Sequence, residues 1–189
     1  MTTLFEQTIN EHLTVIQALS GQASIFEQIA DQMCHAIFKG GKIIWCGNGG
    51  SAADAQHLAA ELVGRFLQER RALPSLALTT NTSVLTAIGN DYGYDLVFRR
   101  QVEALCLDRD VFVGISTSGN SKNVCAAIKA ARKIGAFTVA LTGAQGGEMA
   151  SLVHASLRIP STETPRIQEA HILCGHMLCD YIEKAVCAI

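Results

Sequence analysis

The chain has 189 residues, of which 49% are hydrophobic and 17% charged, with 15 basic and 17 acidic residues and a formal net charge of −2. This composition excludes an intrinsically disordered chain, and the length is that of one domain with a core of its own. The near-neutral charge argues against a nucleic-acid partner but allows a local site for a small anion.

The N-terminal segment, MTTLFEQTINEH, has polar and acidic residues where a secretory signal needs a basic start and an apolar run. No apolar stretch reaches the length of about 18 residues that a membrane helix needs, so we expect no membrane partner. The seven cysteines are odd in number and form no CxxC pair, which indicates small buried side chains in a reducing compartment. These features predict a cytoplasmic protein.

Two amphipathic helices are predicted over residues 3–38, because apolar residues recur there at helical spacing on both sides of a break near residues 20–21. The glycine pair at 40–41 ends the second helix. The short apolar run Lys42–Cys46, KIIWC, then predicts a buried strand.

From this strand onward, short apolar runs alternate with amphipathic stretches. The runs predicted as strands are 76–78, 111–115, 138–141 and 157–159. The stretches predicted as helices are 54–66, 84–88, 96–105, 124–134 and 165–186, the last with Pro165 in its first turn. Such alternation is typical of parallel strands covered on both faces by helices. We therefore predict one α/β domain over 1–189, with N-terminal helices over 1–39 and an α/β core with a C-terminal helix over 40–189.

Two of the predicted strands end in polar, glycine-containing loops that lead into helices. They are Gly47–Ser51, GNGGS, and Ser116–Ser121, STSGNS. Helix N-termini offer free N–H groups to an anion, and two such loops on one parallel sheet should face the same crevice. Ordinary helix capping by Ser and Asn is the alternative. Neither loop is a Walker A or GxGxxG motif, which argues against a nucleotide, and Thr142–Gly147 is predicted to be a turn into a short helix.

His57 and Glu61 stand four residues apart on the helix after the first loop. That spacing places them on one helix face, about 6 Å apart along the axis. They could supply a general base or part of a metal site, and a surface His–Glu pair is the alternative.

The final helix carries Gln168, His171 and His176. Gln168 and His176 are about 12 Å apart along it, so they share a small site only if that site spans two turns. His171 points at another angle and is predicted to be a packing or surface residue. The remaining histidines, which lack ligand-like neighbours in the sequence and are predicted to be structural, are His12, His35 and His154.

Four segments together are similar to those of the phosphoheptose isomerases, a branch of the SIS (sugar isomerase) domain family. The segments are CGNGGSAADAQHLAAELVGRF, LTAIGNDYGYDLVFRRQVEAL, GISTSGNSKNV and PRIQEAHILCGH. The resemblance runs in register from about Ile25 to Ile189. It implies a flavodoxin-like three-layer sandwich around a five-stranded parallel sheet, and a homotetramer whose active sites lie between subunits.

The resemblance also implies an activity and its residues. The family converts the sugar phosphate sedoheptulose 7-phosphate to D-glycero-D-manno-heptose 7-phosphate, the first step toward the activated heptose of bacterial surface polysaccharide such as lipopolysaccharide. Glu61 matches the base and His176 the partner acid. The positions that match a zinc site, with one ion per subunit, are His57, Glu61, Gln168 and His176. The positions that match substrate contacts are Asn48, Gly49, Gly50, Glu61, Asn90, Asp91, Ser116, Thr117, Ser118, Ser121 and Gln168.

Three other functions fit parts of the pattern. A non-catalytic SIS scaffold that binds the replication initiator would lack the catalytic Glu and the final His, whereas Glu61 and His176 are both present. Isomerases for arabinose 5-phosphate usually carry regulatory domains, and SIS transcription regulators carry a helix-turn-helix domain, neither of which we predict here.

Overall fold

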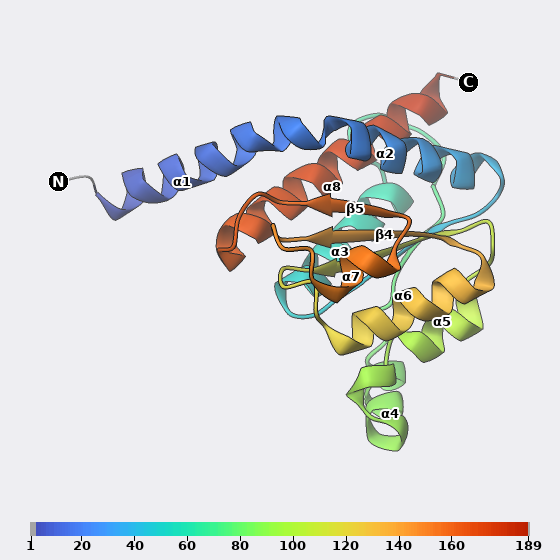
Figure 1. Cartoon of the computed structure of the whole chain (residues 1–189). Coiled ribbons are helices and arrows are strands. Elements are labelled where there is room, and N and C mark those ends of the chain that lie inside the picture. Colours follow the sequence, from blue (N-terminus) through green and yellow to red (C-terminus); the bar gives the residue numbers. More distant parts are fainter. Residues whose placement is uncertain (1–2, 189) are drawn as a thin grey trace.

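The computed structural model describes residues 3–188, which fold around a five-stranded parallel sheet of order β2-β1-β3-β4-β5 (Figure 1). The strands are β1 (Ile43–Gly47), β2 (Ser75–Ala77), β3 (Val111–Ser116), β4 (Phe137–Thr142) and β5 (Ala155–Arg158). Every strand pair is parallel, with Ile43 opposite both Ser75 and Val111. The predicted flavodoxin-like α/β architecture is confirmed.

Helices cover both faces of the sheet and extend beyond it. They are α1 (Leu4–Ala18), α2 (Ala23–Phe38), α3 (Gly50–Val63), α4 (Thr82–Tyr92), α5 (Arg99–Leu105), α6 (Lys122–Ile134), α7 (Gly147–Leu152) and α8 (Thr164–Cys187), with 3-10 turns η1 (Leu19–Gln22) and η2 (Tyr94–Leu96). Helices α2, α3 and α8 cover one face, and α5, α6 and α7 cover the other. Alternate side chains of β1 point to the two faces of the sheet. Trp45 packs in the core under α2, α3 and α8, and Ile44 packs in the core under α5, α6 and α7.

The boundaries of several predicted elements were wrong, and the helices expected over 84–88 and 96–105 run over Thr82–Tyr92 and Arg99–Leu105. The last strand begins at Ala155, two residues before the expected run. The prediction missed this start because Ala155 and Ser156 give little hydrophobic signal. The helix expected over 54–66 runs instead over Gly50–Val63. It begins inside the glycine loop, where Gly49 turns the chain at a φ of 56°. It ends at the C-cap residue Gly64, and a side chain of α8 binds the backbone N–H groups of residues 66–68 that follow.

A buried ion pair closes the end of the sheet opposite the two polar loops. The Lys42 ammonium lies 2.6 Å from Asp110 Oδ2, and the carboxylate also accepts hydrogen bonds from the backbone N–H groups of Lys42 and Leu107. The side chain of Asp110 is fully buried. This network joins the beginnings of β1 and β3.

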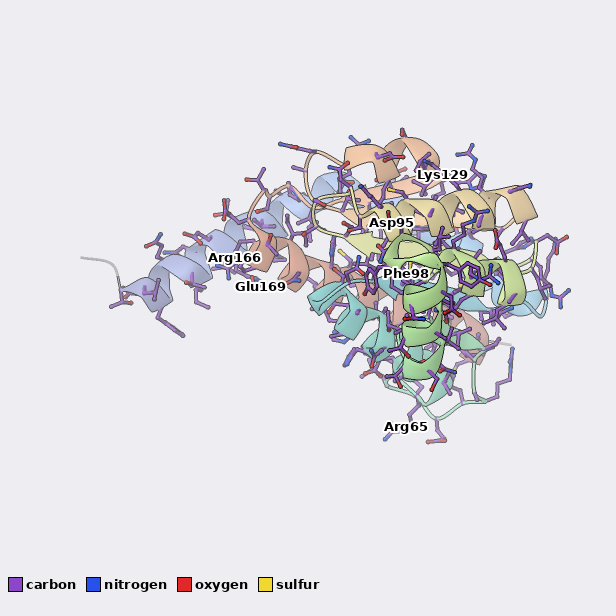
Figure 2. The ribbon with its side chains drawn as sticks, turned by 90° about the horizontal axis from the view of Figure 1, so that it is seen from below. Arg65, Asp95, Phe98, Lys129, Arg166 and Glu169 are labelled. Carbon is purple, nitrogen blue, oxygen red and sulfur yellow. The ribbon has the colours of Figure 1, made fainter. Side chains whose placement is uncertain are left out.

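Helices α1 and α4 have little contact with the body of the chain. Helix α1 extends away from the sheet with Leu4 and Phe5 80% and 75% exposed, and no residue of α4 is buried (Figure 1). The described contacts of α1 include an ionic one in which Arg166 and Glu169 of α8 meet Glu11 and His12. Figure 2 shows Arg166 and Glu169 together beside α1. Both helices therefore present apolar side chains that the single chain does not cover.

The cysteines are free and six of the seven are buried, with Cys187 exposed. Burial raises the pKa of the Cys174 thiol to about 11, so this sulfur is an inert thiol at neutral pH. The prediction of small buried side chains is confirmed for these six. Within residues 3–188, no helix has the length and apolar character needed to cross a membrane.

Candidate active site

The two polar loops lie side by side where β1 and β3 end. These neighbouring strands send their connections to opposite sides of the sheet, which makes the crevice between them the topological switch point. Asn48 in the first loop and Asn123 in the first turn of α6 exchange two side-chain hydrogen bonds, each 2.9 Å long. This reciprocal pair fixes the first loop to the helix that follows the second.

The hydroxyl groups of the second loop converge on one another. Ser116 Oγ lies 2.9 Å from Ser121 Oγ and 3.4 Å from Ser118 Oγ. Helix α7 braces the loop, since the backbone N–H groups of Glu148 and Met149 donate to Asn120 Oδ1 and to the Gly119 carbonyl. The loop therefore presents clustered hydroxyl groups on a fixed backbone.

Simple capping does not account for either loop. The residue before α3 is Gly49, which has no side chain to cap with, and Ser121 before α6 makes no capping hydrogen bond. Each helix thus begins without a side-chain cap from the residue that precedes it. This arrangement favours the anion-binding interpretation over the capping alternative.

Gln168 packs against the start of α3. A Cβ atom at Gly50 would lie only 2.4 Å from Gln168 Nε2, so the absence of a side chain at Gly50 allows this approach. Gln168 is therefore at the edge of the first loop.

His57, Glu61 and His176 form a compact cluster farther along α3 and α8. His57 Nε2 lies 2.8 Å from His176 Nε2 and 3.2 Å from Glu61 Oε1. One ligand-type atom from each residue lies within 4.8 Å of the others. Close helix packing produces this cluster, because a Cβ at Gly175 would lie 2.5 Å from Leu58 Cδ2. Two imidazoles and a carboxylate at this separation can share protons or hold a cation.

The single chain keeps the cluster apart from the loops. Along α3, His57 lies about 10 Å and Glu61 about 16 Å from Gly50. Along α8, Gln168 lies about 12 Å from His176. Of the four expected metal positions, the structure brings three together and places Gln168 beside Gly50 instead.

Asn90 and Asp91 lie at the exposed end of α4, where the Asn90 amide donates to Asp91 Oδ1. A link to the first loop comes from the nearby Tyr94, whose hydroxyl lies 3.5 Å from Asn48 Oδ1.

Comparison with known proteins places the chain in a family. The family model described as "SIS domain" matches residues 5–143. A phosphoheptose isomerase of Aquifex aeolicus is 50% identical over 97% of this chain and 95% of its own length. The chain belongs to the phosphoheptose isomerase family of SIS-domain proteins.

Further members of the family support this assignment. A phosphoheptose isomerase of Rhodospirillum rubrum is 60% identical over 88% of both chains. The solved structure of the phosphoheptose isomerase from Neisseria gonorrhoeae superimposes with a TM-score of 0.90 at 46% identity, over 96% of this chain and all of that one. Fold and family thus agree along almost the whole chain.

Some residues near the candidate site gave no signal in the sequence. Phe66 packs on His176 with ring centroids 5.5 Å apart, although it was predicted to be the end of a helix. Asn123 resembles an ordinary helix residue. Asp54 has a buried Oδ2 atom with no hydrogen-bond partner among residues 3–188, and burial raises its pKa to about 6 despite the opposing effect of His57. Phe66 and Asn123 make their contacts with segments distant in sequence.

The histidines outside the cluster are held by structural contacts. His171 is buried with Nε2 3.3 Å from the Thr142 carbonyl oxygen, as expected of a packing residue. His154 Nδ1 accepts from the Thr138 backbone N–H and stacks on Phe137. His12, which was predicted to be structural, meets Glu169 of α8 in the fold.

His171 should make stability depend on pH. Burial lowers its pKa to about 4, against the opposing effect of the hydrogen bond to Thr142. The unfolded chain takes up a proton below about pH 6.5 and the folded chain only near pH 4, so stability falls as the pH falls through this window. Between pH 7 and pH 5 we expect this residue to lower the free energy of unfolding by about 2 kcal/mol.

Urea unfolding of wild type and His171→Gln at pH 7 and pH 5 checks this. The glutamine keeps a donor for the Thr142 carbonyl but does not titrate, so the variant should lose this part of the pH dependence. An unchanged difference between the two pH values would contradict the assignment.

Proposed function

We propose that this protein converts sedoheptulose 7-phosphate to D-glycero-D-manno-heptose 7-phosphate, with Glu61 and His176 as the proton-transfer residues. As a member of its family, the chain is a phosphoheptose isomerase that acts on a sugar phosphate in heptose biosynthesis. The observation that carries the residue assignment is the cluster of Glu61, His57 and His176 on two packed helices. The product is expected to enter the synthesis of activated heptose for lipopolysaccharide.

The reaction requires proton transfers at two neighbouring carbons. In this mechanism the Glu61 carboxylate removes a proton from C1 of the ketose while His176 donates a proton to the carbonyl oxygen on C2, which forms an enediol. Return of a proton to C2, with loss of the proton on the C1 oxygen, completes the aldose. Such acid and base groups contribute about 10²–10⁴-fold each.

The loops account for the phosphate end of the substrate. The converging hydroxyls of Ser116, Ser118 and Ser121 and the uncapped start of α6 suit a phosphate dianion. Binding there is remote from the reacting carbons and orients them. The full proposed set of substrate contacts is Asn48, Gly49, Gly50, Glu61, Asn90, Asp91, Ser116, Thr117, Ser118, Ser121 and Gln168.

The donor set at the cluster suits zinc. Two imidazole nitrogens and a carboxylate oxygen are common zinc ligands, and tetrahedral ligands at 2.0–2.1 Å lie about 3.3 Å apart, close to the distances within the cluster. His57, Glu61 and His176 would hold the ion, with Gln168, whose amide lies beside Gly50, as the fourth position of the proposed set. A bound zinc ion would polarise the oxygens on C1 and C2 of the substrate.

We further propose a homotetramer in the cytoplasm, with active sites built between subunits. The separation of the cluster from the loops along α3 supports a site completed by a second copy. The apolar side chains of α1 and the unburied helix α4 support contact between copies. Buried free thiols suit a reducing compartment.

The non-catalytic scaffold that binds a replication initiator is the alternative function. Glu61 and His176 both lie close to the His57 imidazole. This argues against a scaffold, because a scaffold has no need of this cluster. Turnover of sedoheptulose 7-phosphate by the wild type distinguishes the two functions.

Glu61→Gln should fold and assemble like the wild type but lose about 10²–10⁴-fold in kcat, because it removes only the base. The measurement is the steady-state rate of aldose formation, with circular dichroism and light scattering as checks of fold and assembly. Glu103→Gln, at a surface ion pair with Arg99, is the matched control and should retain full activity. Near wild-type turnover by Glu61→Gln would show that another group is the base.

Metal removal should inactivate the enzyme. We expect about one zinc per chain by elemental analysis, loss of turnover after dialysis against a chelator, and recovery on addition of zinc. His57→Gln should lower the bound zinc without a change in fold. No bound metal and unchanged turnover after chelation would leave a metal-free mechanism for the same residues.

Mixed assemblies test whether sites are shared between subunits. Glu61→Gln lacks the base, and Ser118→Asp places a negative charge in the phosphate loop, so each variant alone should be inactive. Unfolding and refolding the two together should restore part of the activity, since some sites would combine an intact cluster with an intact loop from different copies. Sites contained within one chain would give no recovery.

A further inference from the structure

A second buried ion pair lies beyond the His57–Glu61–His176 cluster, between α8 and the segment after α3. The Glu183 carboxylate accepts hydrogen bonds from the consecutive backbone N–H groups of Phe66, Leu67 and Gln68, at 2.6–2.9 Å, and from Arg70 Nε at 3.0 Å. The side chains of Glu183 and Arg70 are 0% and 3% exposed. Burial alone would raise the pKa of Glu183, but these N–H donors and Arg70 hold it below its ordinary value, so the carboxylate stays ionised.

The Arg70 guanidinium also holds the end of α3. Its Nη2 donates to the carbonyl oxygen of Glu61, at 2.9 Å, and its Nη1 donates to those of Leu62, Gly64 and Arg71. The last carbonyl groups of a helix have no hydrogen-bond donors within the helix. Here Arg70 is the donor to two of them, those of Glu61 and Leu62. Because one of these belongs to Glu61, Arg70 fixes the backbone that carries the proposed base.

The Glu183 carboxylate also affects the position of His176, through Phe66. With its backbone N–H held by Glu183, Phe66 places its ring against His176, with the centroids 5.5 Å apart and the planes inclined at 30°. His176 in turn contacts His57. The ion pair thus reaches Glu61 through Arg70 and His176 through Phe66.

We infer that the buried Glu183–Arg70 pair is a positioning element that sets the relation between Glu61 and His176, with Phe66 as its contact to the His176 ring. This inference rests on the proposed function, in which these two residues exchange protons with the substrate. The pair touches neither the substrate loops nor the ligand atoms of the cluster. Its loss should therefore lower kcat more than it changes KM.

The chain offers a matched control for general destabilisation. Lys42 and Asp110 form another ion pair with a fully buried carboxylate that also binds backbone N–H groups, at the opposite end of the sheet. Arg70→Met and Lys42→Met each leave a buried carboxylate without its cation. Both should lower the melting temperature, but only Arg70→Met alters the relation of Glu61 to His176.

The test compares Arg70→Met, Phe66→Leu and Lys42→Met with the wild type. We expect kcat to fall about 10–100-fold in the first two variants with KM changed less than about twofold, and to stay within about twofold of wild type in the third. Phe66→Leu keeps the ion pair and all the backbone donors, so it tests the contact with His176 alone, and Arg70→Lys tests the pair if Arg70→Met fails to fold. Arg70→Lys, which restores the charge without the planar donor fork, should recover activity only in part.

A readout that is independent of turnover is the NMR signal of His176. In chelator-treated protein with 13C-labelled histidine, this signal is assigned by its disappearance in His176→Gln. It should move in Phe66→Leu and Arg70→Met, because the aromatic ring leaves or shifts, and stay in place in Lys42→Met.

An unmoved His176 signal in the first two variants would overturn the inference, as would an equal loss of kcat in Arg70→Met and Lys42→Met. An inactive wild type would refute the proposed function instead, and the NMR comparison would still decide whether the ion pair positions His176.

Discussion

The parallel packing of α3 on α8 is the contact on which the site depends. From one end to the other, Gln168 meets Gly50, Gly175 meets Leu58, and His176 meets His57. Two glycines allow this close approach, because a Cβ at either would lie within 2.5 Å of a side-chain atom of the other helix. The cluster is thus a consequence of how tightly two helices pack rather than of one local motif.

The sheet positions the two polar loops proposed to bind the phosphate. Its switch point between β1 and β3 brings two helix N-termini to one crevice, and the Asn48–Asn123 pair holds them in register. Since α3 runs away from this crevice, each further turn takes its side chains farther from the phosphate loops. In the proposed homotetramer, a second copy of the chain would bring its own cluster against these loops.

Buried polar groups give the site its rigidity. The Glu183 carboxylate accepts hydrogen bonds from four donors. Arg70 donates to carbonyl groups at the end of α3 that have no partners within the helix. A buried charge with this many partners fixes geometry, because any displacement leaves some of them unsatisfied. Asp54 is the contrasting case, since its buried Oδ2 has no partner within the described chain.

From the sequence we could predict the layers of the fold, the parallel sheet, the two polar loops and the pairing of His57 with Glu61. Apolar periodicity and the spacing of residues on a helix are local properties, so they can be recognised without the structure. The flavodoxin-like architecture with five strands came from the family resemblance, and the order of the strands came from the structure. The resemblance also grouped His176 with His57 and Glu61, and the tertiary structure shows these three side chains together while Gln168 lies beside Gly50. The tertiary structure also shows that the Glu183 carboxylate, more than a hundred residues away in the chain, binds the N–H groups of residues 66–68 that follow the end of α3. Contacts between distant segments leave no periodic pattern in the sequence, so local sequence patterns could not predict them.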